Sequence, residues 1–265
     1  MPPTFSITTD LAGQKEDAAR LFPAFAAAGF QAVHWCQDWT GQPVFYDEAI
    51  ARNVARLAGE CGLRVADVHA FSGTRPEGPP WTDELFEAIN RNRAEFAARV
   101  GAEVLVLHLP AMPTPEPAEA ARRAVADVGR LLPACRELSV RLAIENLAGP
   151  AHTPALFDAL FEAFAPDELG FCYDSGHALL TDEPGLIARY ADRLAATHLH
   201  DNDGWADQHR PPGEGVADWP MILGTIKRSR YAGTVNLEVH LPPDEDLAAF
   251  CKRIRTDLAE RWGAA

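Results

Sequence analysis

The chain has 265 residues, 47% of them hydrophobic, and a formal net charge of −14. That length supplies one large core, and the sequence has no apolar stretch of about 18 residues, the length that a membrane-spanning helix needs. The acidic balance opposes attraction to phosphate backbones and anionic lipids, so we expect neither nucleic acid nor membrane as a partner and favour a small-molecule substrate.

Eight short runs rich in Val, Ile, Leu and aromatic residues follow one another along the chain. They span residues 4–9, 31–36, 64–70, 103–109, 141–147, 169–175, 196–202 and 234–240. Longer stretches of helical periodicity separate them, which is typical of βα units and a parallel sheet. Eight such units occupy the whole chain, so the sequence predicts the α/β class and a (β/α)8 TIM barrel, as a single domain over residues 1–265.

The segments between the predicted strands contain helix and loop signals. Helices are predicted over 16–30, 47–63 and 83–102, and they end at Gly29, Gly62 and Gly101, where a left-handed cap needs no Cβ. Proline-rich segments at 74–81 and 109–117 follow the third and fourth strands, where a barrel carries its active-site loops. A substrate lid and an ordinary surface loop both remain open for these segments.

The N-terminal segment and the cysteines indicate the compartment in which we expect the protein. The N-terminal MPPTFSITTD has no basic segment followed by an apolar run, so we expect a cytoplasmic protein. The five cysteines are widely spaced and form no CxxC pair, which indicates neither a disulfide framework nor a cysteine-rich zinc site.

Metal-ligand residue types gather at the predicted strand ends. All nine histidines lie at strand ends or in the loops that follow them. Because such positions converge on the carboxyl-terminal face of a barrel, one pocket would receive many nitrogen and oxygen ligands. The residues concerned are His69, His108, Glu145, Asp174, His177, His198, His200, Asp207, His209 and Glu238, whereas His34, His152 and His240 are interpreted as hydrogen-bonded wall residues.

Three of these residues are carboxylates at the ends of apolar strands. Glu145, Asp174 and Glu238 would be costly to desolvate, and they would repel one another in one cavity. A divalent metal removes that repulsion, and histidine as co-ligand suits Zn, Mn, Fe or Co better than Ca. The sequence therefore predicts a metal site.

Five motifs carry a resemblance to a known family: IENLAG (144–149), FCYDSGHA (171–178), HLHDND (198–203), DQHRPPGEGVADW (207–219) and LEVH (237–240). They resemble the xylose isomerase-like TIM barrel superfamily, which contains sugar isomerases and epimerases, inosose dehydratases and endonuclease IV enzymes. The resemblance implies a divalent metal (Mn, Zn, Co, Mg or Fe) held by Glu145, Asp174, His198 and Glu238, with one ion expected and two or three left open.

Two histidines of the seventh predicted strand fit the ligand position in that set. His198 with Asp201 fits the family pattern H-x-x-D and is preferred, but His200 with Asp203 fits it too. Alternation places both imidazoles on the same side of the strand. The other residues that the resemblance offers for a second metal or for the substrate are His69, His108, His177, His200, Asp207, His209 and Arg210.

The resemblance implies a sugar isomerase or epimerase that acts by proton transfer. A metal that chelates a carbonyl oxygen and the adjacent hydroxyl acidifies the neighbouring C–H and stabilises the enediolate, and Glu145 and Glu238 would be the catalytic acid and base. Ketose 3-epimerases of the superfamily carry an arginine and a second glutamate where this chain has Gly204 and Ala151. Arg210 could substitute, or the substrate could be a modified sugar or an inositol derivative.

Two other functions stay open. An endonuclease IV-like zinc phosphodiesterase (AP endonuclease family 2) needs nine ligands for three ions, and this chain has candidates for all nine: His69, His108, Glu145, Asp174, His177, His198, Asp207, His209 and Glu238. The charge of −14 opposes that alternative. The third function is a non-catalytic sugar-binding barrel. The sequence leaves open which sugar is bound and whether the chain forms a homo-oligomer.

Overall fold

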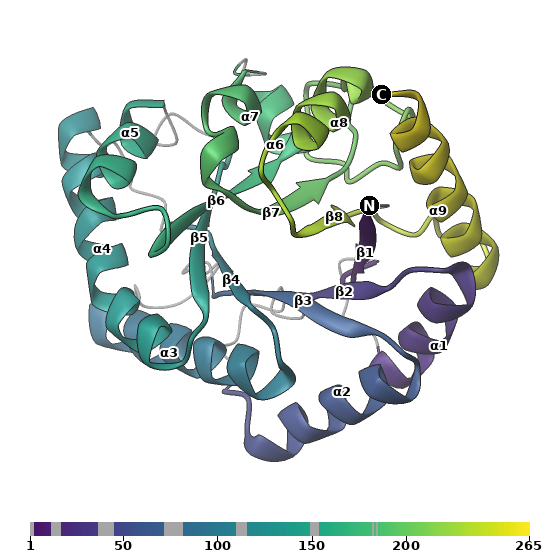
Figure 1. Cartoon of the computed structure of the whole chain (residues 1–265), viewed down its shortest axis with the longest axis horizontal. Helices are drawn as coiled ribbons and strands as arrows, with labels where there is room; N and C mark the ends of the chain where they lie inside the picture. Colours follow the sequence, from purple (N-terminus) through teal and green to yellow (C-terminus); the bar gives the residue numbers. More distant parts are fainter. Residues whose placement is uncertain are drawn as a thin grey trace.

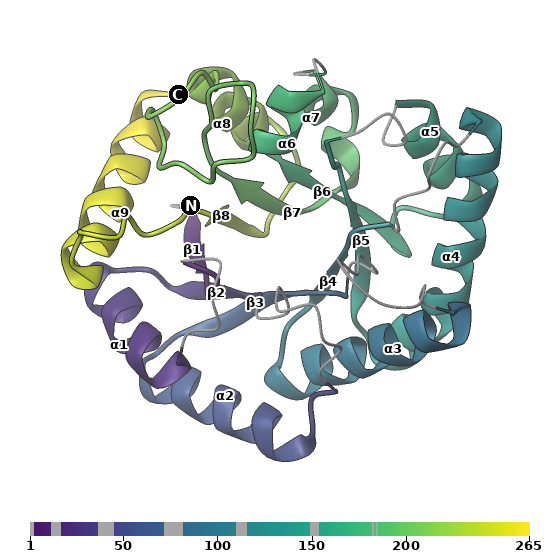
Figure 2. The same cartoon turned by 180° about the vertical axis from the view of Figure 1, so that it is seen from behind.

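The computed structural model describes residues 3–11, 17–36, 45–71, 82–109, 116–148, 154–181, 183 and 185–265. Eight parallel strands form a closed barrel in the order β1 to β8, and helices surround it, as Figures 1 and 2 show from opposite sides. The (β/α)8 prediction is therefore confirmed. Residues 74–81, 110–115, Ala151 and His152, which entered the sequence analysis, lie outside the described residues.

The strands match the eight predicted runs, and their ends differ by one to three residues. They are β1 (Thr4–Thr8), β2 (Ala32–Trp35), β3 (Arg64–His69), β4 (Val104–Leu107), β5 (Arg141–Glu145), β6 (Leu169–Asp174), β7 (Leu194–Leu199) and β8 (Thr234–Leu237). Helices cover the outer face of the barrel and side chains fill its interior, so most strand residues are buried and apolar.

The helical elements lie around the barrel. They are α1 (Ala18–Ala28), α2 (Glu48–Glu60), α3 (Asp83–Val100), α4 (Pro117–Glu137), α5 (Pro154–Ala163), α6 (Ser175–Leu180), α7 (Leu186–Arg189), the 3-10 helix η1 (Ala191–Arg193), α8 (Trp219–Arg228) and α9 (Leu247–Ala264). No helix in the described part of the chain combines the length and the apolar character required to cross a membrane.

Local signals start and stop these helices where the sequence predicts. In α3 the Thr82 side chain accepts a hydrogen bond from the backbone N–H of Leu85, and Asp83 and Glu84 lie in the first turn. Such residues satisfy free N–H groups and the positive end of the helix dipole. The helix ends at Gly101, whose φ of 76° is the left-handed conformation expected of a glycine cap.

Two clusters of buried side chains pack the barrel. The larger one is the hydrophobic core and contains fully buried rings such as Phe22, Phe96 and Phe157, and the smaller one consists of short side chains on the strands. That cluster consists of Val106, Ala143, Cys172, Ala195 and Ala196. The register pairs Glu145 with Cys172 and Asp174 with His198, so the carboxylate of β6 stands two residues further along than that of β5.

Candidate metal centre

Five buried side chains meet where the strands end, and we call them the inner ligand group. They come from five strands or the residues directly after them: His69 (β3), His108 (after β4), Glu145 (β5), His198 (β7) and Glu238 (after β8). The carboxyl ends of parallel barrel strands converge, which explains why residues so distant in sequence become neighbours.

The distances within the inner ligand group are short. His198 Nδ1 lies 2.8 Å from Glu238 Oε2 and 3.1 Å from Glu145 Oε2. His108 Nε2 lies 3.0 Å from the same Glu145 oxygen and 3.2 Å from His69 Nε2. A single point between these atoms is thus surrounded by nitrogen and oxygen.

Several of these atoms are buried without a hydrogen bond. Glu145 Oε2, His198 Nδ1 and Glu238 Oε2 have no partner in suitable geometry, although the two carboxylate oxygens lie 3.1 and 2.8 Å from His198 Nδ1. Ligand atoms about 2.1 Å from one cation lie about 3.0–3.4 Å apart, which is the spacing found here. The donor set therefore fits a divalent ion.

Three imidazoles are held in the tautomer that a metal requires. Their Nδ1–H groups each donate to a backbone carbonyl, which can only accept, so Nε2 is the nitrogen of each ring that can give up its proton and bind a metal. The pairs are His69 with Ala70 O (2.6 Å), His177 with Asn146 O (2.9 Å) and His209 with Glu238 O (2.8 Å). This arrangement is usual behind metal-binding histidines, because it fixes both ring orientation and tautomer.

A second set of side chains adjoins the first, and we call it the outer ligand group: Asp174, His177, His200, Asp207 and His209. His200 Nε2 lies 3.0 Å from Asp174 Oδ1, and Asp207 Oδ2 lies 3.3 Å from both His177 Nε2 and His209 Nε2. The Asp207 side chain is 38% exposed, so this group faces solvent more than the inner one does. The two groups meet at Glu145, whose Oε1 is 3.3 Å from His177 Nδ1.

The DSGH sequence, which begins at the last residue of β6, explains the position of His200. Asp174 caps α6 by accepting from the His177 backbone N–H at 2.7 Å. A β carbon at Gly176 would lie 1.8 Å from His200 Cε1, so His200 packs directly against this glycine. His177, expected in a loop, instead lies in α6, because Asp174 supplies the cap that starts the helix.

The predicted four-ligand set is divided between the two groups. Glu145, His198 and Glu238 lie together, whereas the imidazoles within ion-pair distance of Asp174 are those of His177 and His200. His198 and His200 are both fully buried, and each lies close to carboxylates of these groups. The structure thus gives each histidine its own carboxylate neighbours, an arrangement that the spacing H-x-x-D does not predict.

Asp67 is a buried carboxylate that the sequence analysis missed. It lies in β3, contacts His34 Nδ1 directly, and its Oδ1 is 3.7 Å from His198 Nε2. Burial by itself would raise its pKa, but His34 and His198 lower the pKa of Asp67 to about 2. The available signal was its position two residues before His69, which places both side chains on the same face of the strand.

Burial and charge set the protonation states of the inner ligand group. Burial, together with the nearby His108, lowers the pKa of His69 to about 3, so this imidazole is neutral. Burial works to raise the pKa of Glu145, but His108 and His198 outweigh it and hold that pKa well below its ordinary value. A charged carboxylate beside neutral imidazole is the ligand chemistry that a divalent cation needs.

The loop after β7 is organised by Asp201. Its carboxylate accepts from the backbone N–H groups of Gly213 and Ala217, both at 3.0 Å, and from Trp219 Nε1 at 2.9 Å. This gives the aspartate of the H-x-x-D pattern a structural role. Arg210 follows His209 in this loop, and its guanidinium contacts Asp203 Oδ2 at 3.4 Å and the Glu214 carbonyl at 3.2 Å.

Comparison with known proteins places the chain in a family. The family model described as "Xylose isomerase-like TIM barrel" matches residues 22–255. The uncharacterized protein y4fM of Sinorhizobium fredii is 30% identical over 248 residues, which are 80% of this chain and 77% of that protein. Inosose dehydratase of Lacticaseibacillus casei is 27% identical over 134 residues, 43% of this chain and 45% of the enzyme.

Solved structures share the fold at low sequence identity. A xylose isomerase domain protein from Alicyclobacillus acidocaldarius has a TM-score of 0.74 at 18% identity, covering 98% of both chains. A D-psicose 3-epimerase, solved in the presence of D-fructose, has a TM-score of 0.72 at 13% identity over 98% of this chain and 97% of that one. An AP endonuclease, family 2, from Brucella melitensis has a TM-score of 0.71 at 15% identity over 93% and 96%.

Proposed function

The chain belongs to the xylose isomerase-like TIM barrel family, and on that premise we propose that it is a divalent-metal-dependent isomerase or epimerase of a sugar or sugar derivative, acting by proton transfer. One observation carries the proposal: the buried carboxylates of Glu145, at the end of β5, and Glu238, directly after β8, reach the same nitrogen of His198 at 3.1 and 2.8 Å. Two carboxylates that close to one point can serve one reacting carbon from two sides.

The inner ligand group would hold the ion, which would supply positive charge to stabilise negative charge that develops on substrate oxygens. Glu145 and Glu238 are held ionised by neighbouring imidazoles despite their burial, so each can accept a proton. One carboxylate takes the proton from a carbon beside a carbonyl, and the other, or the same one, returns it. Return to the opposite face inverts the carbon, and return to the adjacent carbon moves the carbonyl.

The outer ligand group would bind the hydroxyls of the substrate or a second ion. Asp207 is partly exposed and lies 3.3 Å from the Nε2 atoms of His177 and His209, so the group offers a carboxylate and two imidazoles to substrate hydroxyls, and Arg210 follows His209 in the chain. Polyhydroxylated molecules are recognised by such convergent polar groups. The inosose dehydratase and D-psicose 3-epimerase among the similar proteins support a sugar or cyclic polyol as the substrate class.

The test is solvent-hydrogen exchange followed by NMR in D₂O, with a panel of ketoses, ketose phosphates and inososes and with added Mn, Co, Mg or Zn. We expect deuterium to enter at a carbon next to the carbonyl, with a new sugar formed; loss of water would instead indicate a dehydratase. Glu145→Gln and Glu238→Gln should each lower turnover at least about 100-fold, because general acid–base catalysis contributes at least that much.

The control is Glu60→Gln, which changes an exposed glutamate of α2 and should leave turnover unchanged. Near-full activity in either Glu145→Gln or Glu238→Gln would remove that residue from proton transfer. Sugar binding without any exchange by the wild-type protein would identify a non-catalytic sugar-binding barrel.

Hydrolysis of phosphodiesters is the second candidate function, and one observation favours it. All nine ligand candidates of that alternative lie in the inner and outer ligand groups, which adjoin at Glu145. Several ions could then hold a phosphate and generate hydroxide. Salt-sensitive binding and cleavage of abasic duplex DNA would support it, and the charge of −14 predicts neither.

A further inference from the structure

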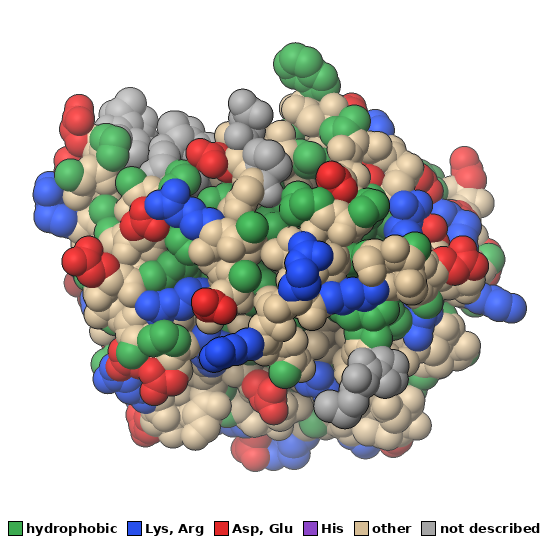
Figure 3. Space-filling view, turned by 45° about the horizontal axis from the view of Figure 1, so that its top comes forward, with side chains coloured by type: hydrophobic (Ala, Val, Ile, Leu, Met, Phe, Trp, Pro, Cys, Tyr) green, Lys and Arg blue, Asp and Glu red, His purple; other side chains and the backbone are tan. Residues whose placement is uncertain are grey.

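His34 and Cys36 are buried residues of metal-ligand type that belong to neither ligand group. His34 lies in β2, Cys36 directly follows that strand, and both lie near Glu238, which directly follows β8. A ligand atom of each of these three residues lies within 4.8 Å of those of the other two. The three are 0%, 2% and 5% exposed, unlike the Asp, Glu, Lys and Arg side chains that Figure 3 shows on the surface. We call His34, Cys36 and Glu238 the thiol ligand group.

Strand alternation directs His34 and Cys36 to the inside of the barrel. Side chains two residues apart lie on the same side of a strand. Between them, Trp35 packs against rings of α1 and α3, since its ring centroid lies 6.4 Å from that of Phe22 and 5.7 Å from that of Phe96. Because the helices surround the barrel (Figure 1), the side opposite Trp35 is the interior.

Thr9, directly after β1, fixes the backbone around these two residues. Its backbone N–H donates to the His34 carbonyl at 3.0 Å. Its hydroxyl accepts from the Cys36 N–H at 2.9 Å and donates to the Cys36 carbonyl at 3.0 Å. All three residues are buried. Ligands that are held in place before an ion arrives lose little conformational freedom when it binds, which favours binding.

His34 has the hydrogen-bond arrangement of a metal-binding histidine. Its Nδ1 contacts Asp67 Oδ1 directly, and the register pairs the two residues across β2 and β3. Because an ionised carboxylate can only accept, Nδ1 carries the hydrogen, and Nε2 is the nitrogen that can bind a metal. That Nε2 is buried without a hydrogen-bond partner among the described residues. Histidines that bind metals usually donate their other N–H to a carboxylate or a carbonyl, so Asp67 supports His34 as a ligand.

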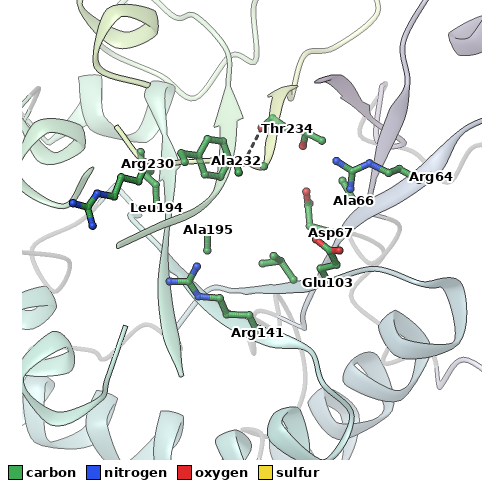
Figure 4. Close-up of a pocket in the computed structure, with 13 residues that line it drawn as sticks. Arg64, Ala66, Asp67, Glu103, Arg141, Leu194, Ala195, Arg230, Ala232 and Thr234 are labelled. Carbon is green, nitrogen blue, oxygen red and sulfur yellow. Dashed lines mark hydrogen bonds between the residues drawn. The ribbon is translucent and has the colours of Figure 1, made fainter. Parts of the chain in front are cut away.

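Asp67 supports His34 from deeper in the barrel. It lines a cavity of about 340 Å³ together with residues at the starts of strands, among them Arg64 (β3) and Thr234 (β8) (Figure 4). The other two members of the thiol ligand group, in contrast, follow the ends of their strands. The thiol ligand group therefore lies at the same end of the barrel as the inner ligand group, and Asp67 supports it from within.

Glu238 belongs to both the thiol ligand group and the inner ligand group. Its Oε2 lies 2.8 Å from His198 Nδ1 and has no hydrogen bond within the described part of the chain. A carboxylate has two oxygens, so it can bind one cation with each. In sites that hold two metals the ions lie about 3.5–4 Å apart. Glu238 can therefore serve two neighbouring ions.

We propose that the thiol ligand group binds a thiophilic divalent cation, such as Zn²⁺, which Glu238 bridges to the ion of the inner ligand group. Imidazole, thiolate and carboxylate together suit Zn²⁺, whereas Mg²⁺ and Ca²⁺ prefer oxygen ligands. Three protein ligands leave the fourth tetrahedral position for water or a substrate oxygen. The Cys36 thiol releases its proton to solvent when the ion binds, and the ion compensates thiolate and carboxylate charges that are costly to bury. The bridge rests on the metal centre proposed above, whereas ligation by Cys36 can be tested without any catalytic activity.

The test is zinc X-ray absorption spectroscopy of the wild-type protein, titrated with Zn²⁺ until no more binds. We expect a sulfur neighbour at about 2.3 Å in addition to nitrogen and oxygen neighbours at about 2.0–2.2 Å. The sulfur distinguishes this ion from an ion of the outer ligand group, which contains no cysteine. Cys36→Ala should remove the sulfur signal, and Cys36→Ala and Asp67→Asn should each weaken the binding of one ion at least about tenfold, because losing even a supporting group costs about 10–100-fold in affinity.

Cys135→Ala is the matched control, because Cys135 is a buried cysteine of α4. It should keep both the sulfur neighbour and the wild-type affinity. Cys172 is the other buried cysteine beside ligand residues, since it lies near Glu145 and His198. Cys172→Ala should also keep the sulfur signal, and loss of the signal in this variant would move the sulfur ligand to the inner ligand group and overturn the proposal.

Two further results would overturn the proposal: only nitrogen and oxygen neighbours in the wild type, or a sulfur signal that persists in Cys36→Ala. Crystals of the wild-type protein soaked in Cd²⁺ provide the measurement that does not depend on the variants folding. We expect an anomalous peak between His34, Cys36 and Glu238, and peaks at the other two ligand groups alone would contradict the site. Solvent-hydrogen exchange by a wild-type protein that shows no sulfur neighbour would refute this site and leave the proposed function in place.

Discussion

Replacing Gly176 by alanine should remove His200 from the outer ligand group while leaving the inner group in place. The new β carbon would lie 1.8 Å from His200 Cε1 and 2.5 Å from Nε2. Because ordinary contact begins near 3.4 Å, the imidazole must retreat by about 1.6 Å. Metal–ligand distances tolerate about 0.2 Å, so the retreat removes His200 as a ligand beside Asp174, 3.0 Å away.

The consequence can be measured as metal affinity by competition with a chelator, together with the number of ions per chain. Loss of ligand orientation weakens metal binding at least about 10–100-fold, so Gly176→Ala should lose the ion of the outer ligand group and keep that of the inner one. His200→Ala, which creates no clash, should have the same effect. Gly59→Ala is the matched control, because nothing lies within 4 Å of its added carbon. Wild-type affinity and ion number in Gly176→Ala would refute the assignment of His200.

Two further predictions concern Asp201 and His209. Asp201→Ala removes the acceptor of three hydrogen bonds from Gly213, Ala217 and Trp219, so the free energy of unfolding should fall by about 3 kcal/mol in urea titration; a loss below about 1 kcal/mol would contradict the role of this residue in the loop. Burial would lower the pKa of His209, but Asp207 and other carboxylates raise it to about 9, so at pH 7 an ion bound there must displace a proton. The affinity of the outer ligand group should therefore rise with pH, about tenfold per unit between pH 6 and 8; calorimetry in buffers of different ionisation enthalpy should count at least one proton released, and a count of zero would contradict this prediction.

The fold was predictable because its signals are local and repeated. Eight apolar runs separated by helical periodicity define a barrel, and glycines such as Gly29 and Gly101 end helices through their own backbone preference. Strand ends were less predictable, since β7 begins at Leu194 and ends at Leu199 while the apolar run suggested 196–202. The chain leaves the sheet where Asp201 pairs with the following loop.

The candidate site was predictable in membership and unpredictable in grouping. Every predicted histidine and carboxylate ligand lies in one of the two groups because barrel topology collects strand ends, whatever the detailed packing, whereas Arg210 lies outside both groups. The division between His198 and His200 depends on Gly176 and on the two-residue offset between Glu145 and Asp174, which are contacts between distant segments. Asp67 was missed because it lies inside its strand and its only spacing signal is His69 two residues later; its partners His34 and His198 come from other strands.

The most direct test of the central claim is elemental analysis of untagged protein purified without chelators. The buried, unpartnered oxygens and nitrogen of Glu145, Glu238 and His198 predict at least one divalent ion per chain, lost in the Glu145→Gln, Glu238→Gln double variant. One ion would assign the inner ligand group alone, and two or three zinc ions would assign the outer group as well and bring phosphodiester hydrolysis forward. A protein that contains no divalent ion and binds none when Mn, Co, Zn, Fe or Mg is supplied would contradict the metal centre and the proton-transfer chemistry built on it.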